Sequence, residues 1–228
     1  MKTILTKELW QYSIDYGSKP LPQILNFITT INKNLINGNM QAGVDVCLFM
    51  GFIANAIKAS SYLEVGIFTG YSLISMLTYL PANSIVTALE LNKKHIEIVQ
   101  SLIQYANNIA INDYNQPKIE QNIEYIQQNA NISMKNLITE NRKYDLIFID
   151  ANKSCYLNYY QYAKKLLTQN GILMIDNVFK GHYNIQEQKK RPNFIEKVHN
   201  MNLVINNDDS VRSIMIPIGD GLTLVQCK

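Results

Sequence analysis

The chain of 228 residues, 47% hydrophobic and 17% charged with a formal net charge of +3, is long enough to form one large α/β domain. Its basic residues are scattered and no run of eighteen apolar residues occurs, so neither a nucleic-acid partner nor a membrane partner is expected. Three cysteines without C-x-x-C spacing argue against structural zinc or disulfides and favour reduced thiols in a cytoplasmic protein.

The first sixty residues are predicted to be mainly helical. A short helix is expected over Leu5–Tyr16, and a second begins after Pro22, where apolar residues recur at helical spacing. A third helix is predicted for Val44–Ala59. We expect residues 1–40 to form a helical cap on a single domain that spans residues 1–228. The aromatic residues of the first helix either cover a pocket or simply pack; they are Trp10, Tyr12 and Tyr16.

Beyond residue 60 the pattern changes to short apolar runs that alternate with amphipathic stretches. Five apolar runs are predicted as strands: Ser61–Gly66, Ser84–Glu90, Lys118–Ile126, Tyr144–Asp150 and Gly171–Val178. Four stretches between them are predicted as helices: Tyr71–Leu80, Lys93–Asn107, Ser133–Thr139 and Tyr156–Leu167. Strands that alternate with helices indicate a parallel, doubly wound sheet with helices on both faces.

The C-terminal stretch Val211–Cys227 has a different pattern. It contains two apolar strands joined by the turn Gly219-Asp220-Gly221, which is typical of a hairpin. The strands of a hairpin are antiparallel, so the end of the chain is expected to add an antiparallel pair to the five parallel strands.

The turn after the first strand, EVGIFTGYS from Glu64 to Ser72, has features of a nucleotide-binding turn. Glu64 stands where a dinucleotide fingerprint has its first glycine, and a carboxylate there suits a ligand with an ammonium or sulfonium group. S-adenosylmethionine carries both groups. Glu90, at the end of the second strand, stands where such folds bind a ribose diol. Alternatively, Gly66 and Gly70 only permit close packing, and Glu90 is a solvated strand end.

Two further strands end in oxygen-bearing side chains. Asp150 ends one strand and is followed by Asn152 and Lys153, while Asp176 and Asn177 end the next strand. Because parallel strands deliver their carboxyl ends to one edge of a sheet, these side chains are expected to lie close together. Oxygen ligands of this kind suit a hard cation such as Mg²⁺, which leaves coordination positions for a vicinal diol.

With these motifs the chain resembles the cation-dependent class I O-methyltransferases, the family of the caffeoyl-CoA and catechol O-methyltransferases and their small bacterial relatives. The resemblance runs from about Met40 to Cys227, in EVGIFTGYSL, YDLIFIDANKSCYLNYY, GILMIDNV and IPIGDGLTL. It implies a Rossmann-like seven-stranded sheet with an antiparallel last strand. It also implies methyl transfer from S-adenosylmethionine to a hydroxyl of a small phenolic, catechol-like substrate, a divalent cation (Mg²⁺, or else Mn²⁺ or Ca²⁺) and a homodimer.

The resemblance also implies roles for individual residues. The donor site would be lined by Met40, Ala42, Glu64, Gly66, Phe68, Ser72, Glu90, Ala130 and Asp150. The metal ligands would be Asp150, Asp176 and Asn177. Lys153 would act as general base beside the catalytic Asp150, although a lysine after a strand can also be a surface charge. Asp220 and Phe179 would border the acceptor, whose pocket the loop Lys180–Arg191, with His182, would shape.

Several positions depart from the family pattern and keep other hypotheses open. Asn152 replaces the usual aspartate, Gln128 and Asn129 replace the residues that usually precede Ala130, and Val46 replaces a glutamate. The alternatives are a weakened S-adenosylmethionine-binding or interaction protein on the same fold, and a metal-independent methyltransferase. A nucleotide-linked oxidoreductase is a third, against which Glu64 argues. His95 and His199 are expected to be surface histidines, and the tyrosines of Tyr156–Leu167 core or interface residues.

Overall fold

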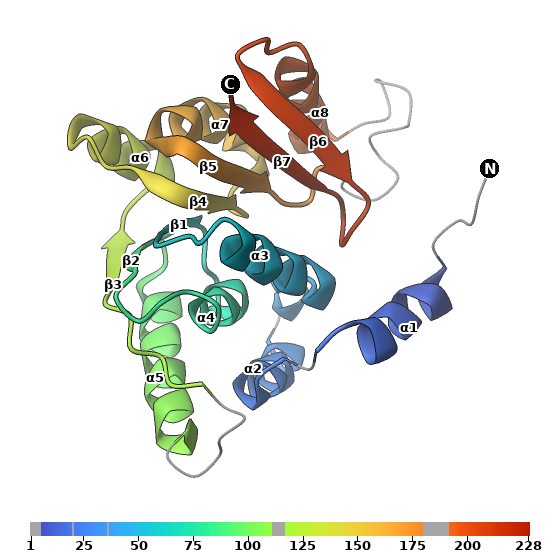
Figure 1. Cartoon of the computed structure of the whole chain (residues 1–228), viewed down its shortest axis with the longest axis vertical. Helices are drawn as coiled ribbons and strands as arrows, with labels where there is room; N and C mark the ends of the chain where they lie inside the picture. The colour runs from blue at the N-terminus through green and yellow to red at the C-terminus, as the bar shows by residue number, and fades with distance from the viewer. Residues whose placement is uncertain (1–5, 20, 36, 111–116, 180–191) are drawn as a thin grey trace.

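The protein is built around one seven-stranded β-sheet. The computed structural model describes residues 6–19, 21–35, 37–110, 117–179 and 192–228, and its strand order is β3-β2-β1-β4-β5-β7-β6 (Figure 1). The strands are β1 (Ser61–Val65), β2 (Ile85–Glu90), β3 (Ile123–Gln127), β4 (Tyr144–Ile149), β5 (Leu167–Ile175), β6 (Val211–Ile216) and β7 (Leu222–Cys227). Strands β1 to β5 pair in parallel, whereas β7 pairs antiparallel with both β5 and β6. The predicted Rossmann-like α/β fold is therefore confirmed.

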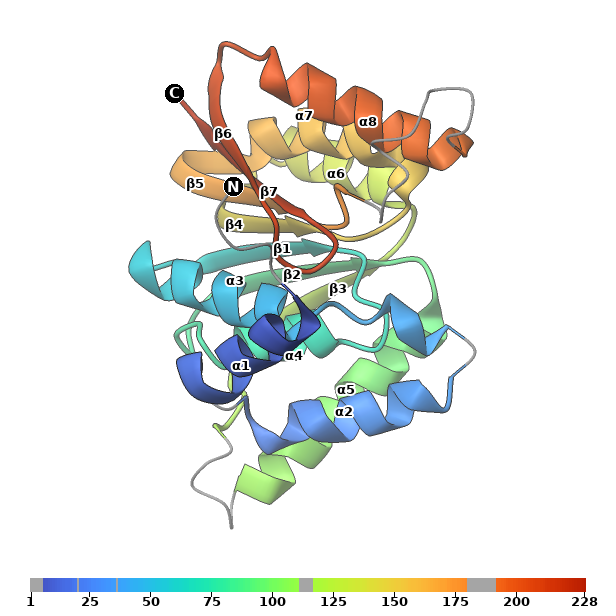
Figure 2. The ribbon, with the colours of Figure 1, turned by 90° about the vertical axis from the view of Figure 1, so that its right-hand side faces the viewer.

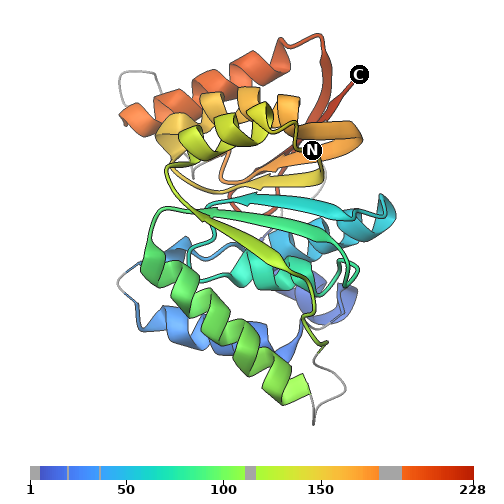
Figure 3. The same cartoon turned by 90° about the vertical axis from the view of Figure 1, so that its left-hand side faces the viewer.

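Helices cover both faces of this sheet. One face carries α2 (Gln23–Lys33), α3 (Val44–Ala56), α4 (Tyr71–Leu77) and α5 (Lys93–Ala110), and the opposite face carries α6 (Ala130–Thr139), α7 (Tyr156–Leu166) and α8 (Asn193–Asn206). Figures 2 and 3 show the sheet between these two layers. Two short 3₁₀ helices, η1 (Gly38–Met40) and η2 (Lys153–Cys155), connect the larger elements. Within the described ranges, no helix combines the length and apolar character needed to cross a membrane.

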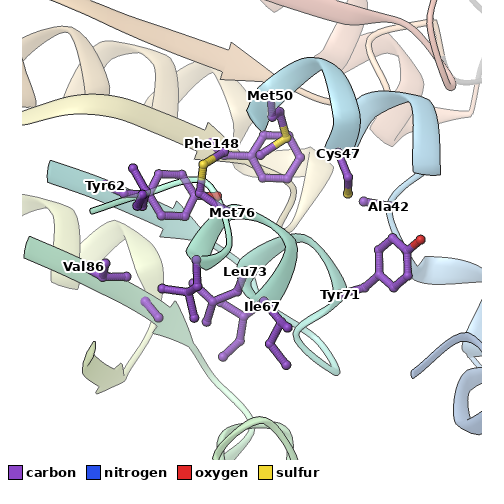
Figure 4. Close-up of a cluster of buried hydrophobic side chains, with 14 of the residues drawn as sticks. Ala42, Cys47, Met50, Tyr62, Ile67, Tyr71, Leu73, Met76, Val86 and Phe148 are labelled. Atoms are coloured by element: carbon purple, nitrogen blue, oxygen red, sulfur yellow. The ribbon is translucent and has the colours of Figure 1, made fainter. Parts of the chain in front are cut away.

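The two faces are separated by the alternation of side chains along each strand. In β1, Tyr62 packs in the cluster with α3 and α4, whereas Leu63 and Val65 pack in the cluster with α6 and α7. Figure 4 shows the first cluster, in which Met50 of α3 lies beside Phe148 of β4. Both faces of the central strands are thus buried, as expected for a parallel sheet.

Several predicted boundaries differ from the structure. The third strand was expected over Lys118–Ile126, but Ile119 instead pairs with the side chain of Asn107, whose amide donates to the Ile119 carbonyl and accepts from its N–H. The fifth strand begins at Leu167 rather than Gly171, directly after α7. The sequence pattern above does not predict α8. Its buried residues nevertheless have helical spacing: Ile195, Val198, Met201 and Ile205.

The N-terminal helices have unequal contacts with the body. Helix α2 buries Ile24, Leu25 and Ile28 against the core. Helix α1 (Lys7–Gly17) buries none of its side chains fully, and its Tyr12 and Tyr16 are exposed. The side chain of Trp10 is half-buried and donates a hydrogen bond from Nε1 to Asp45 Oδ2 (2.9 Å). Among the described residues, Trp10 is thus the aromatic residue of α1 that packs against the rest of the domain, and none of the three lines the cavity described below.

Candidate active site

A cavity of about 700 Å³ opens at the carboxyl ends of β1, β2, β4 and β5. This is the edge where doubly wound sheets bind their ligands, and the volume is in the range of small-molecule sites. Most of the predicted donor, metal and acceptor residues line it: Met40, Ala42, Gly66, Phe68, Ser72, Glu90, Ala130, Asp150, Lys153, Asp176, Asn177 and Asp220. Side chains from distant parts of the sequence therefore meet in one space.

The turn after β1 brings the backbone close to the cavity. Gly66 has φ +90°, and a Cβ built there would lie 2.9 Å from backbone atoms of Asp150 and Ala151. Only glycine fits this position without moving β4. Phe68 is also left-handed, with φ 47°, which is unusual for a bulky residue. Its N–H donates to Glu90 Oε2 (3.1 Å), so the strained turn is joined to the end of β2.

Glu90 is held at the cavity wall by two backbone N–H groups. Oε2 accepts from Phe68, and Oε1 accepts from the N–H of Asn92 (2.9 Å). His95 Nδ1 lies 3.5 Å from Oε1, and the imidazole packs edge-on to Phe68 with the ring centroids 5.0 Å apart. His95 lines the cavity, so the expectation that it is a surface histidine is wrong. Its position five residues after Glu90, in the first turns of α5, was the signal available in the sequence.

Glu64 differs from its predicted place, because it lies beneath the cavity and does not line it. The side chain is fully buried and accepts hydrogen bonds from Tyr62 Oη (2.6 Å) and Ser72 Oγ (2.5 Å). Burial raises the pKa of Glu64 to about 8, against the lowering effect of these two hydrogen bonds. Alternation along β1 explains the difference, since Glu64 faces the same side of the sheet as Tyr62. Glu64 thus orients Ser72, which does line the cavity.

The segment Met40–Ala42 forms part of the cavity wall and is hydrogen-bonded to α2. The side chain of Gln41 accepts from Asn32 Nδ2 (2.8 Å) through Oε1 and donates from Nε2 to Thr29 Oγ1 (3.1 Å). Gln41 also lines the cavity, although the sequence patterns did not single it out. Gln128, Asn129 and Ala130 also line the cavity, at the start of α6, and Asn129 caps this helix by accepting from the N–H of Asn131 (3.0 Å).

The acidic side chains at the ends of β4 and β5 form the polar end of the cavity. Asp176 is almost fully buried, and burial together with the nearby charge of Asp150 raises its pKa above the usual value. Asn177 has a left-handed φ of 57° and donates its N–H to Asp176 Oδ1 (2.7 Å). Lys153 Nζ contacts Asp150 Oδ1 and lies 5.2 Å from the ring centroid of Tyr156. Two carboxylates in mutual repulsion, partly balanced by one lysine, are a suitable place for a cation.

Asp150, Asp176 and Asn177 bring two carboxylates and one amide to the cavity wall, and oxygen ligands of this kind would suit a hard divalent ion. Over the part of the chain that the structure describes, no three His, Cys, Asp or Glu side chains converge as a metal-binding group. The side-chain oxygen of Asn177 would be the third protein ligand beside Asp150 and Asp176. Asn152, which departs from the family pattern, caps η2 by accepting from the N–H of Ser154 (3.1 Å). Its amide oxygen serves in a role that an aspartate also fills.

The loop between β6 and β7 contributes to the wall of the cavity. Gly219 and Asp220 line it together with Val46 and Tyr159. Phe179 does not, in contrast to its predicted place beside the acceptor; its N–H donates to the carbonyl of Asp220 (2.9 Å), and its ring packs against Gly221. Phe179 thus supports the loop that carries Asp220. The predicted acceptor loop Lys180–Arg191, with His182, lies outside the described residues.

The known proteins that this chain resembles in sequence are methyltransferases. The sequence model of a family described as O-methyltransferase matches residues 15–228. Caffeoyl-CoA O-methyltransferase 1 of Zea mays is 26% identical, over 95% of this chain and 83% of its own length, and tapetum-specific methyltransferase 1 of Arabidopsis thaliana is 29% identical, over 81% and 77%.

Solved structures agree on the fold. The O-methyltransferase of Bacillus cereus in complex with SAH has a TM-score of 0.79 at 23% identity and covers 96% of both chains. The SAH-bound methyltransferase PaMTH1 of Podospora anserina has a TM-score of 0.79 at 22% identity and covers 100% of both chains. The architecture is therefore shared over essentially the whole chain.

Proposed function

The chain belongs to the O-methyltransferase family, whose reaction uses S-adenosylmethionine, and from this premise we propose that it methylates one hydroxyl of a catechol-like molecule with the aid of a divalent cation. The observation that carries this proposal is the position of Asp150, Asp176 and Asn177 on the wall of the same cavity as Gly66 and Glu90. Donor and cation sites that share one cavity can bring a methyl group and a chelated hydroxyl into contact.

The donor would lie along the ends of β1 and β2. Glu90 would accept hydrogen bonds from the ribose diol, and the Gly66 turn would let the ligand approach the backbone closely. Ser72 and the segment Met40–Ala42 would face the amino-acid part of the donor, with Ala130 and Phe68 beside the nucleoside. The attachment of Gln41 to α2 also supports residues 1–40 as a cap on one domain that spans the chain.

Replacement of Glu90 by alanine should weaken donor binding about ten- to a hundredfold. A charge-assisted hydrogen bond to a buried partner contributes roughly 1.5–3 kcal/mol, and Glu90 is held in place by two backbone N–H groups. Calorimetry with S-adenosylhomocysteine, the demethylated donor, measures the change. Glu97→Ala is the matched control, because Glu97 is an exposed glutamate near the start of α5 that pairs, among the described residues, only with the exposed Lys93. An unchanged dissociation constant for Glu90→Ala would exclude Glu90 from the donor site.

The cation would be held by Asp150, Asp176 and Asn177. When bound, such an ion orients two adjacent oxygens and makes the attacking hydroxyl more acidic. The carbon–sulfur bond of the donor breaks as the new carbon–oxygen bond forms, and the hydroxyl proton must leave. Lys153 is the proposed proton acceptor because it lines the cavity beside Asp150, and it must be a neutral amine to take up the proton. Asp220 would border the acceptor from the opposite side.

A panel of phenols tests the proposed acceptor class. Catechols and caffeoyl-type esters should be methylated, and the matched monophenols should be poor substrates, because a single oxygen cannot chelate an ion. Turnover is measured by chromatography with S-adenosylmethionine in excess, with and without EDTA. Equal turnover of a catechol and its monophenol would show that chelation is not part of the mechanism.

A further inference from the structure

We propose that Asp45, at the start of α3, is a positioning residue for the acceptor side of the cavity. Its carboxylate joins three segments that are remote in sequence: helix α1, the N-terminus of α3 and the loop 217–221 between β6 and β7. The link to the acceptor rests on the function proposed above, whereas the hydrogen bonds of Asp45 are independent of that function.

Both oxygens of Asp45 are used. Oδ2 accepts hydrogen bonds from Trp10 Nε1 (2.9 Å) and from the N–H of Gly219 (2.8 Å), while Oδ1 accepts from the N–H of Val46 (3.0 Å). Trp10 and Gly219 are separated from Asp45 by 35 and 174 positions. Hydrogen bonds to an ionised acceptor are stronger than neutral ones, so a single carboxylate can hold both segments.

Glycines on two sides leave room for this carboxylate. A Cβ at Gly43 would lie 2.5 Å from Asp45 Oδ1, so a side chain at position 43 would displace the carboxylate. Gly219 has φ 53°, and a Cβ there would lie 2.6 Å from Val46 Cγ2. The loop can therefore approach α3 closely enough to donate its N–H only with glycine at position 219. Glycine at positions 43 and 219 thus leaves the space that the Asp45–Gly219 hydrogen bond requires.

The contact bears directly on the cavity. Gly219 and Asp220 line it from the loop, and Gly43 and Val46 line it from the start of α3. On its other side the loop is attached to the chain that follows Asp176 and Asn177, because the carbonyls of Asp220 and Gly221 accept from the N–H groups of Phe179 and Val178. The loop is therefore held by Asp45 on one side and by Val178 and Phe179 on the other, and loss of the Asp45 contact removes the first of these attachments. Asp220 would then be displaced, whereas Gly66 and Glu90 lie on β1 and β2 and would stay in place.

The same carboxylate docks α1. That helix buries no side chain fully, and Trp10 is the residue through which it hydrogen-bonds to α3. Trp10 is also the single tryptophan of the chain. The position of α1 can therefore be followed by intrinsic tryptophan fluorescence without any label.

The test compares four proteins in full-length form: the unmutated chain, Asp45→Ala, Asp45→Asn and the control Asp15→Ala. Asp15 lies on the exposed side of α1, where it accepts from Gln11 only locally (2.8 Å). Asparagine at position 45 can keep an oxygen toward Trp10 and Gly219 but presents an N–H₂ group to the N–H of Val46, so it should rescue the contact in part. The measurements are tryptophan emission, amide hydrogen exchange of the peptide containing residues 217–221, affinity for S-adenosylhomocysteine, and the kinetic constants for a catechol.

In Asp45→Ala we expect a red-shifted Trp10 emission and about tenfold faster exchange of the Gly219 amide, since the native acceptor is lost. Acceptor KM should rise about tenfold, as for the loss of one or two charge-assisted hydrogen bonds, while S-adenosylhomocysteine affinity changes less than twofold. Asp45→Asn should give emission, exchange and acceptor KM values between those of Asp45→Ala and the unmutated protein. Asp15→Ala should match the unmutated protein in all of them.

Unchanged emission and exchange in Asp45→Ala would overturn the proposal, as would a loss of donor affinity equal to the rise in acceptor KM, which would indicate general damage. If the unmutated protein methylates no catechol, the proposed function fails, and fluorescence with hydrogen exchange decides the Asp45 contact on its own.

Discussion

Asp176→Ala is expected to reduce methyl transfer by at least about three orders of magnitude, equivalent to about 4 kcal/mol of transition-state stabilisation. Asp176 is buried at the end of β5 beside Asp150, and burial together with the nearby charge of Asp150 raises its pKa. A divalent ion bound between them would relieve that repulsion and hold the acceptor. Steady-state methylation of a catechol measures the loss, and calorimetry with S-adenosylhomocysteine should show donor affinity within a few-fold of normal.

Three comparisons identify the lost charge as the cause. Asp176→Asn keeps the size and one oxygen but removes the charge, and it should be nearly as inactive as the alanine variant. Asn177→Ala should be milder, because a neutral amide contributes geometry more than charge. EDTA should reproduce the loss in the unmutated protein, and Mg²⁺ should restore activity. Full activity after complete chelation would favour the alternative of a metal-independent methyltransferase.

Gly66→Ala is expected to destabilise the fold and to weaken donor binding together. The left-handed backbone costs an alanine about 1–2 kcal/mol, and the added methyl meets backbone atoms of Asp150 and Ala151 at 2.9 Å, which cannot move as a flexible side chain would. With the overpacking cost of about 1–3 kcal/mol, the midpoint of thermal unfolding should fall by roughly 5–15 °C for a chain of this size.

Gly17→Ala provides the matched control for this experiment. A Cβ at Gly17 has no neighbour within 4 Å, and its φ is not left-handed, so the same chemical change should leave the unfolding midpoint almost unaltered. Differential scanning calorimetry and binding of S-adenosylhomocysteine are measured on both variants. An unfolding midpoint for Gly66→Ala within 1–2 °C of the unmutated protein would show that the β1 turn relaxes easily and does not fix the distance between β1 and β4.

Hydrophobic periodicity and the residues at strand ends predict where the cavity lies, but they do not predict the direction of side chains whose orientation depends on packing. Phe179 follows the acidic end of β5 closely, yet its ring packs against Gly221 and does not line the cavity. The sequence predicts a surface position for His95, yet its imidazole lies beside Glu90 because α5 begins three residues after β2 ends. In each case the chain position is predictable, but the direction of the side chain depends on neighbouring elements.

The amino-acid sequence by itself determined the order of the strands and of the helices before α8, the parallel central strands, the C-terminal hairpin and the strand ends that carry Asp150, Asp176 and Glu90. These features depend on hydrophobic periodicity and turn residues, which act over a few positions and are therefore visible in the sequence. Only the tertiary structure decided that Glu64 lies beneath the cavity and that Asp45 joins Trp10 to Gly219. Such contacts depend on which faces pack together and on segments up to 174 positions apart, because burial and close packing are properties of the whole fold.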